Sequence, residues 1–175
     1  MPDNPGPDSS TPNNPGPMAD TGRLKVTTTA EREVQFVRDF NAPARLVFDA
    51  HTKPELMKRW LLGPAGWTMP VCEVDLRVGG GYRCVWSHPD HSPFEITGVY
   101  QEIVAPRRIV NRESFNGEDP ALCTLVLAEQ DGVTTMTFTM AFVSRQARDA
   151  ALQTGMATGM EQSYQRLDGM AAKGF

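Results

Sequence analysis

The stretch VTTMTFTMAF at residues 133–142 decides the fold, together with the run SRQARDAALQTGMATGMEQSYQRLDGMAA at residues 144–172. In the first run apolar and threonine side chains alternate, and a period of two predicts a strand that is covered on one face only. In the second run the apolar residues keep helical spacing. This predicts one helix over residues 145–172, capped by Ser144 and roughly 40 Å long at about 1.5 Å per residue. Because the apolar face of the strand must be buried, we expect this helix to lie over it.

Gly155 and Gly159 lie inside the predicted helix, where each costs about 1 kcal/mol of helix propensity relative to alanine. Two interpretations are open: the glycines allow close packing of the helix on the strand, or they leave room for a bound molecule. Both depend on the missing side-chain volume, so the sequence does not choose between them.

The rest of the chain supplies further strands and two short helices. EREVQFVRDF, which begins at Glu31, has the period of a strand. Asn41 and Pro43 then resemble the cap and first residue of a helix, and Thr52 with Glu55 forms a capping box for a second helix. Five more β-like runs follow between turn residues: VCEVDL, YRCVWSH, FEITGVYQEIV, RRIVNRESF and LCTLVLAEQ. The pattern predicts an α+β fold, with an antiparallel sheet of about six or seven strands around the C-terminal helix and two short helices after the first strand.

The N-terminal segment has a different composition. Residues 1–20, MPDNPGPDSSTPNNPGPMAD, repeat Asn-Pro-Gly-Pro and contain almost nothing to bury, so they cannot offset the entropy of becoming ordered. We therefore expect residues 1–30 to be a disordered leader and residues 31–175 to be the folded domain. Met1 and Met18 remain alternative starts of translation.

Charge and composition narrow the possible roles. A net charge of −4, from 17 Lys+Arg against 21 Asp+Glu, gives no cationic footprint for nucleic acid or anionic lipid. The longest apolar stretches are far shorter than the ~20 residues that span a bilayer, and no secretory signal is evident, so a cytoplasmic protein is expected. No nucleotide, phosphate or hydrolase fingerprint occurs, which predicts no cofactor and no familiar catalytic machinery.

The cysteines and histidines do not form a recognisable metal or disulfide pattern. Cys72, Cys84 and Cys123 are far apart and lack a C-x-x-C spacing, so buried free thiols are expected. His88 and His91 lie in HPDHSP, which is typical of a hairpin loop, and no third distant ligand is evident. No metal site is predicted.

Four separated segments carry a resemblance to a known family: FNAPARLVFDAHTKPELMKRWLLGPAGW, VCEVDLRVGGGYRCVW, TGVYQEIVAPRRIV and RDAALQTGMATGMEQSYQRLDGM. In order and spacing they resemble bacterial proteins of the START-like (SRPBCC) superfamily, in the branch named for the activator of the heat-shock chaperone ATPase. The resemblance covers residues 31–172. It implies a helix-grip fold, in which a curved sheet and the final helix enclose a cavity that in many relatives receives a lipid, hormone or polyketide-like molecule. In a chain of this length we expect no chaperone-docking domain like that of the eukaryotic cochaperone.

Such a cavity would be lined by one face of the strands and the facing stripe of the helix. For any one apolar candidate, ordinary core packing is favoured over contact with a ligand, but as a group they suggest a cavity, and the methionines would make an adaptable wall. Glu113 could orient the polar end of a ligand or act as a base, or it could be an exposed residue paired with Arg112 or Arg83. The candidate ligand-binding residues are Trp60, Trp67, Tyr82, Trp86, Glu113, Met136, Phe138, Met156, Met160 and Tyr164.

Three functions follow from these patterns. The first is binding of a small hydrophobic or amphipathic molecule between the sheet and the C-terminal helix. The second is a cavity enzyme of cyclase or hydrolase type, and the third is a chaperone-associated protein-interaction module, for which an apolar patch on the outer sheet face would be the sign. The sequence leaves the ligand, the protein partners and a possible homodimer open.

Overall fold

Nine strands form one antiparallel sheet in the computed structural model, which describes residues 19–21 and 23–175. The strand order is β1-β2-β3-β9-β8-β7-β6-β5-β4. The last strand, β9, therefore pairs with β3 from the N-terminal part of the chain. The strands are β1 (Ala19–Thr21), β2 (Leu24–Ala30), β3 (Glu33–Phe40), β4 (Thr68–Val74), β5 (Gly81–His88), β6 (His91–Val104), β7 (Arg108–Phe115), β8 (Ala121–Gln130) and β9 (Val133–Ala141).

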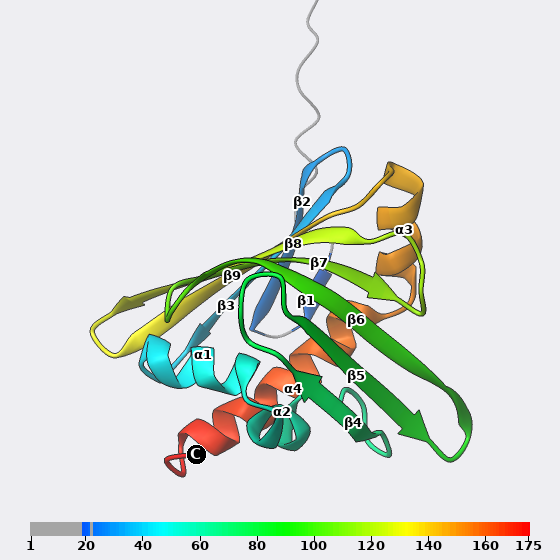
Figure 1. Ribbon diagram of the computed structural model, residues 1–175. Helices are drawn as coiled ribbons and strands as arrows, with labels where there is room; N and C mark the ends of the chain where they lie inside the picture. The colour runs from blue at the N-terminus through cyan, green and yellow to red at the C-terminus, as the bar shows by residue number, and fades with distance from the viewer. Residues whose placement is uncertain (1–18, 22) are drawn as a thin grey trace, which may run out of the picture.

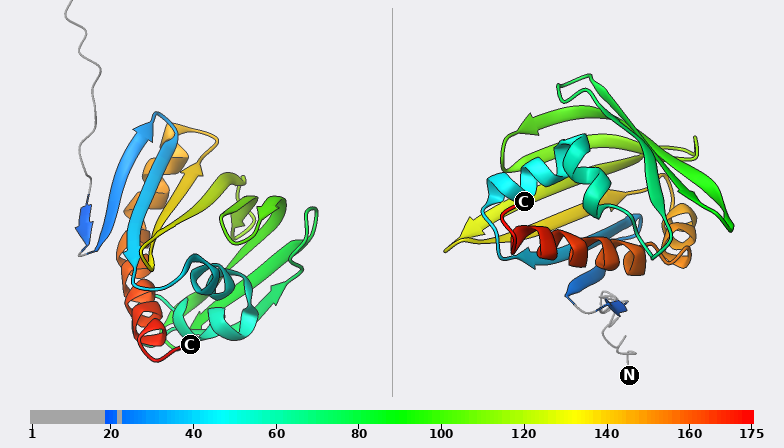
Figure 2. Two further views of the ribbon diagram at one scale, coloured as in Figure 1. Left: turned by 90° about the vertical axis from the view of Figure 1, so that its left-hand side faces the viewer. Right: turned by 90° about the horizontal axis from the view of Figure 1, so that it is seen from below.

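In the described part of the chain, four helices accompany the sheet: α1 (Ala44–Thr52), α2 (Pro54–Trp60), α3 (Arg145–Gln153) and α4 (Met156–Ala171). Figures 1 and 2 show the strands curving around α1, α2 and α4, with α3 at one end of the sheet. This is the helix-grip arrangement, and the predicted α+β class is confirmed. We call the side of the sheet that bears these three helices the concave face.

Strand β9 has the alternation that its sequence predicts. Met136 is fully buried and Met140 nearly so, and Phe138 packs against the same core from a partly buried position. Phe138 lies directly between Phe36 on β3 and Leu125 on β8, so one row of side chains crosses three strands. Thr135, Thr137 and Thr139 alternate with these residues on the other face, whereas Thr134 is buried on the inward face. The period of two therefore identifies the inward face correctly.

The long C-terminal helix was expected to be continuous, and this expectation is wrong. Ser144 does cap its start, since its Oγ accepts a hydrogen bond from the Ala147 N–H at 3.1 Å. The helix then ends at Gln153 and restarts at Met156, because Gly155 adopts φ +81°, a left-handed conformation that interrupts the helical hydrogen bonds. Gly159 lies inside α4, where an added Cβ would make only an ordinary contact with Pro64 at 3.8 Å, so the glycine is not required for close packing on a strand.

The predicted caps of the two short helices are also wrong. Pro43, not Asn41, is the N-cap of α1, and the Ala44 N–H donates to the Glu129 carboxylate of β8 at 2.8 Å. Thr52 does not cap α2, since its hydroxyl donates to the Phe48 carbonyl at 2.9 Å within α1. At α1 a distant carboxylate, Glu129, takes the place of the predicted cap. At α2 the predicted cap is lost because the Thr52 hydroxyl bonds to the Phe48 carbonyl.

The folded part begins earlier than residue 31. Strand β2 pairs with β3, and Leu24 and Val26 are buried at 0% and 1% exposure. The predicted leader of residues 1–30 is therefore wrong for residues 24–30, and β1 and β2 raise the strand count from the expected six or seven to nine. For residues 1–18 and 22, the prediction of a disordered leader lies outside the residues that the structure describes.

A buried ion cluster holds α4 against the sheet. Arg38 of β3, which is 1% exposed, donates to the Glu161 carboxylate at 3.0 Å and to both oxygens of Asp168 at 2.9 and 3.0 Å. Glu161 also accepts the Leu24 N–H at 3.0 Å, which joins β2 to the same cluster. Although burial raises the pKa of Glu161, the Arg38 hydrogen bond and charge lower it overall.

No helix within the described part of the chain is long and apolar enough to cross a membrane.

Candidate functional site

Tyr82 and Glu113 form a polar pair on the concave face. Register places Tyr82 of β5, Gly98 of β6 and Glu113 of β7 in one row across the sheet. The Tyr82 ring lies across β6 where Gly98 has no side chain, and its hydroxyl donates a hydrogen bond to the Glu113 carboxylate. Gly98 thus allows a side chain from β5 to reach a carboxylate two strands away.

The next inward row adds two polar residues that the sequence analysis missed. Asn111 of β7 donates from Nδ2 to the Tyr82 hydroxyl at 2.6 Å. Tyr100 of β6 lies opposite Asn111, with its ring centroid 5.2 Å from that of Tyr82. The available signal was the period of two, because Asn111 lies two residues from Glu113 on one strand and therefore on the same face.

Burial raises the pKa of Glu113 above its ordinary value, and the hydrogen bond from Tyr82 only partly opposes this. The pKa values of Tyr82, Tyr100 and Tyr164 are also raised, in each case first by burial and additionally by the negative charge of Glu113. Glu113 and Tyr82 are only half-buried, so the pair is also accessible to solvent.

Glu113 is not the exposed partner of an arginine that the sequence left as an alternative. Arg83 pairs with Glu95 at 3.0 Å, and Arg112 points to the outer face, opposite Val99 and Leu122. Among residues 19–21 and 23–175, no cation lies within ion-pair distance of Glu113, and its Oε1 receives no hydrogen bond. The carboxyl therefore keeps one acceptor atom free.

Apolar side chains of α4 pack in the same core cluster as Tyr82. Tyr164 stacks on Trp60 at 5.4 Å between ring centroids, and Met156 and Met160 are half-buried in the same core cluster. Of the predicted site residues, the structure gathers most in or against this cluster: Trp60, Tyr82, Met136, Phe138, Met156, Met160 and Tyr164, with Glu113 attached through Tyr82. Met136 and Trp60 are almost fully buried.

Two predicted residues lie elsewhere. Trp86 belongs to a second core cluster, and its indole N–H donates to the Leu61 carbonyl at 2.7 Å. Trp67 packs on the edge of this second cluster, with its ring 5.1 Å from that of Phe94 and 5.8 Å from that of His91. The structure therefore does not bring these tryptophans to the Glu113 pair.

His51 carries a buried nitrogen that has no hydrogen-bond partner among residues 19–21 and 23–175. Its Nδ1 lies 2.7 Å from the Val47 carbonyl, which requires a proton on Nδ1 and leaves Nε2 as a bare acceptor. Burial lowers the pKa of His51 to about 4, so the ring is neutral. The ring contacts Trp60 at 4.8 Å and Tyr164 at 6.1 Å between centroids. His51 thus borders the same aromatic group.

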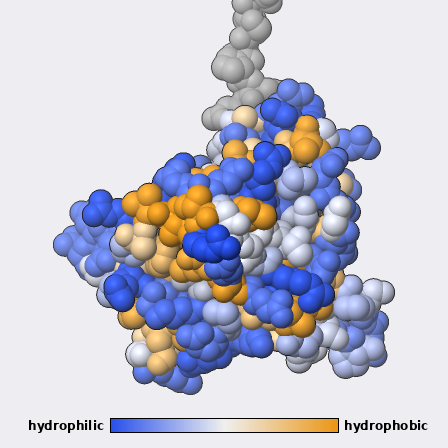
Figure 3. Space-filling view, in the orientation of Figure 1, coloured by the Kyte–Doolittle hydropathy of each residue, from blue (hydrophilic) through white to orange (hydrophobic). Residues whose placement is uncertain are grey.

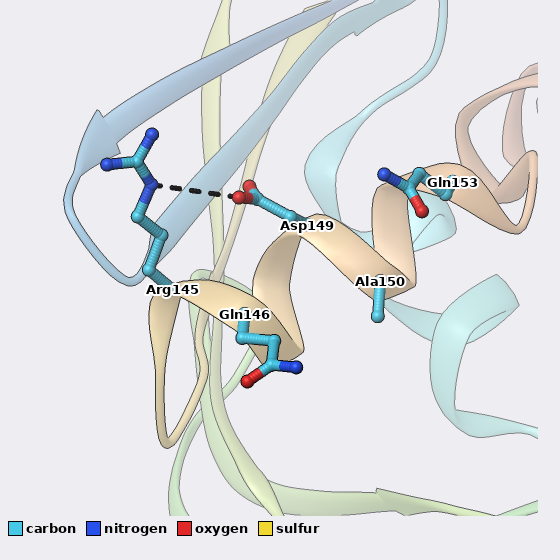
Figure 4. A pocket seen from close by; sticks show the side chains of 5 residues that line it. All are labelled: Arg145, Gln146, Asp149, Ala150 and Gln153. Atoms are coloured by element: carbon cyan, nitrogen blue, oxygen red, sulfur yellow. Dashed lines mark ion pairs between the residues drawn. The ribbon is translucent and has the colours of Figure 1, made fainter.

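Two open hollows mark the surface. One, of about 510 Å³, lies along α3 and is lined by Arg145, Gln146, Asp149, Ala150 and Gln153, with Arg145 3.7 Å from Asp149 (Figure 4). The other, of about 430 Å³, opens beside Tyr82 and is lined also by Val74 and Gly81. The second borders Tyr82 at the edge of the sheet, and Glu113 is not among the residues that line it.

The histidine pair and the outer sheet face are weaker candidates for a functional site. His88 and His91 face each other across the β5–β6 hairpin, and no group of three potential metal ligands occurs within the described residues. Figure 3 shows apolar surface interrupted by hydrophilic residues, and on the outer sheet face Arg112 separates the exposed Val99 from Leu122.

Comparison with known proteins agrees with this architecture. A protein from Rhodobacter sphaeroides is 30% identical with a TM-score of 0.79, over 86% of this chain and 98% of that one. A protein from Staphylococcus epidermidis is 26% identical with a TM-score of 0.72, over 84% and 93%. An AHSA1-like protein from Aeromonas hydrophila, 20% identical with a TM-score of 0.64 over 77% and 92%, shares the fold. No curated protein matches the chain in sequence.

A family model confirms the resemblance seen in the four sequence segments. It describes the Activator of Hsp90 ATPase homolog 1-like protein and matches residues 41–172, from before α1 to the end of α4. The match covers most of the chain, and the fold is that of a family of ligand-binding domains. The chain belongs to the family of Activator of Hsp90 ATPase homolog 1-like proteins.

Proposed function

We propose that the protein binds a small amphipathic molecule on the concave face, with the polar end of the molecule on Glu113 and its apolar part against α4. The observation that carries the proposal is the Glu113 carboxyl, which is half-buried, unpaired with any cation of the described residues, and bonded to Tyr82 through one oxygen only. A desolvated carboxyl with a free acceptor atom is a preferred contact for a ligand.

The free polar atoms of the site favour a ligand that donates hydrogen bonds. Glu113 Oε1 and His51 Nε2 are acceptors, whereas the Trp60 N–H is already used by the Ala50 carbonyl. Arg38, a buried cation over the Tyr164 ring, is occupied by Glu161 and Asp168. An amine or hydroxyl head group therefore matches the site, and a carboxylate head group would meet the like charge of Glu113.

The apolar part of the ligand has a matching surface. Met156 and Met160 are half-buried on the side of α4 that packs against the core, beside the buried ring of Tyr164. Thioether side chains adapt to irregular apolar guests, because they are unbranched and have several rotatable bonds. This surface supports binding of a short alkyl or ring system.

The test uses three probes that differ only in the head group: octylamine, octanol and octanoate. We expect saturable one-to-one binding of octylamine and octanol in isothermal titration calorimetry below their micelle concentrations, and no saturable binding of octanoate. Glu113→Gln should weaken the affinity for octylamine by about 10- to 100-fold, because a hydrogen bond to a charged group contributes about 1.5–3 kcal/mol. The affinity for octanol should fall less.

Glu118→Gln is the matched control, since it removes one exposed acidic charge from the loop after β7. It should leave the affinity for octylamine unchanged. Equal binding of octanoate and octylamine, or equal loss in both variants, would contradict the proposal.

The raised pKa of Glu113 and its bond to Tyr82 also favour a second candidate, a cavity enzyme of cyclase or hydrolase type in which this pair transfers a proton. The distinguishing measurement is the fate of a molecule that native mass spectrometry finds bound. Conversion that is lost in both Glu113→Gln and Tyr82→Phe would support catalysis, whereas release of the unchanged molecule would leave binding as the function.

A further inference from the structure

Three sulfur atoms gather where β4, β5 and α2 meet. Cys72 of β4 and Cys84 of β5 are directly opposite each other in the antiparallel register, with 3.7 Å between their Sγ atoms. The Met57 Sδ of α2 lies 3.8 Å from the Cys72 Sγ. The third cysteine, Cys123, is fully buried on β8, opposite Asn111 and Met140, and belongs to the other core cluster.

The backbone geometry at Cys72 and Cys84 permits a disulfide. Directly opposed residues of an antiparallel pair have Cα atoms about 4.5 or 5.5 Å apart, and both values fall in the range of about 4.4–6.8 Å found in disulfides. Both side chains lie on the same face and in one core cluster. Rotation about the side-chain bonds is therefore sufficient to bring the two sulfurs together, without separating β4 from β5.

The two thiols differ in reactivity. The Cys84 thiol donates a hydrogen bond to the Cys72 sulfur, and this bond, with the nearby positive charge of Lys58, lowers the pKa of Cys72 despite burial. The same bond and burial raise the pKa of Cys84. Cys72 is 7% exposed on β4, which is the edge strand, whereas Cys84 is 1% exposed. Cys72 is thus the better nucleophile of the pair.

We propose that Cys72 and Cys84 form an oxidisable dithiol that a peroxide converts to a cross-strand disulfide. The Cys72 thiolate attacks one peroxide oxygen, the O–O bond breaks, and the leaving hydroxide takes a proton to become water, which leaves a sulfenic acid on Cys72. The Cys84 sulfur then attacks the Cys72 sulfur and displaces the sulfenic oxygen as a second water, with the Cys84 proton. Two thiols are oxidised by two electrons and one hydrogen peroxide is reduced to two waters.

The disulfide would join the edge strand β4 to β5 at the rim of the concave face. Val74 and Tyr82 form the next inward pair of the same two strands, two residues from Cys72 and Cys84. Oxidation would therefore fix the strands on either side of the hollow beside Tyr82.

The test treats the reduced, folded, full-length protein with hydrogen peroxide and follows its intact mass. We expect the loss of two hydrogen atoms without added oxygen, and digestion should give one cross-linked peptide that contains Cys72 and Cys84. The disulfide should form at least about tenfold faster than Cys123 is oxidised, since reactivity follows thiolate character and exposure. Cys123→Ser should behave like the wild type.

Cys84→Ser removes the resolving thiol, so Cys72 should stop at the sulfenic acid and be trapped by dimedone. A disulfide that involves Cys123, oxidation of Cys123 at the rate of Cys72, or no reaction at peroxide concentrations that oxidise free glutathione would each overturn the proposal.

Discussion

Replacing Gly98 with alanine should break the polar pair without touching either of its members. A Cβ at this position would lie 2.3 Å from Tyr82 Cζ and 2.4 Å from Tyr82 Cε1 and Oη. Non-bonded carbon atoms pack about 3.5–4.0 Å apart, so the Tyr82 ring must move by roughly 1 Å or more and leave its place over β6. The Tyr82 hydroxyl then loses its bonds to Glu113 and Asn111.

The magnitude follows from these two hydrogen bonds. The bond to Asn111 contributes about 1 kcal/mol and the bond to the Glu113 carboxyl about 1.5–3 kcal/mol, while replacing a strand glycine with alanine returns about 0.5–1 kcal/mol. We expect a net loss of about 2–3 kcal/mol in the free energy of unfolding. For a chain of this length that is a fall in Tm of about 5–10 °C. The pKa of Glu113 should rise further, because the hydrogen bond that lowers it is gone.

Urea denaturation of a double-mutant cycle gives the assay. Tyr82→Ala removes the ring, so Gly98→Ala in that background should be neutral or slightly stabilising. Tyr82→Phe keeps the ring and removes the hydroxyl, so it should cost about as much as the two bonds alone, which is about 2.5–4 kcal/mol. If Gly98→Ala costs the same with and without the Tyr82 ring, the clash is not with Tyr82 and the reasoning is refuted.

Three further substitutions test other parts of the structure. The folded-state pKa of His51, about 4, lies below its ordinary value of 6.5, so between these pH values only the unfolded chain binds the proton, and the free energy of unfolding declines by up to roughly 3 kcal/mol as the pH falls. His51→Phe should reduce that decline, measured by urea titrations at pH 7 and pH 4.5. An unchanged difference in the free energy of unfolding between the two pH values would contradict this. Arg38→Leu should cost about 3–5 kcal/mol in chemical denaturation, because Glu161 then stays buried without its cation, and a cost below about 1 kcal/mol would show that the cluster does not hold α4. Gly169→Ala, where an added Cβ meets nothing within 4 Å, should raise stability by about 0.8–1 kcal/mol if the end of α4 is helical, and a loss would argue against that helix end.

The sequence determined the elements whose signals are local. The alternation of β9 identified its buried face, and Ser144 caps α3 because a cap is formed with a backbone N–H three residues away. The four sequence segments indicated the family, and Tyr82 and Glu113 were both named as candidates for one site.

Elements that depend on distant partners could not be predicted in this way. Leu24 and Val26 are too few to resemble a strand core, and β2 is ordered because it pairs with β3 and because Glu161 accepts the Leu24 N–H. The start of α1 is satisfied by Glu129, which is 85 positions from Ala44 in the chain. Local patterns contain no information on such acceptors.

The sequence by itself therefore determined the fold class, the inward face of β9 and the type of residue that lines the concave side. The break of the last helix at Gly155, the separation of Trp67 and Trp86 from Glu113, and the inward direction of Glu113 toward Tyr82 became known only from the three-dimensional structure. For Glu113 the cause is strand register. A shift of one residue between neighbouring strands would turn Glu113 to the other face, and register is set by the pairing of whole strands and not by the residues around Glu113.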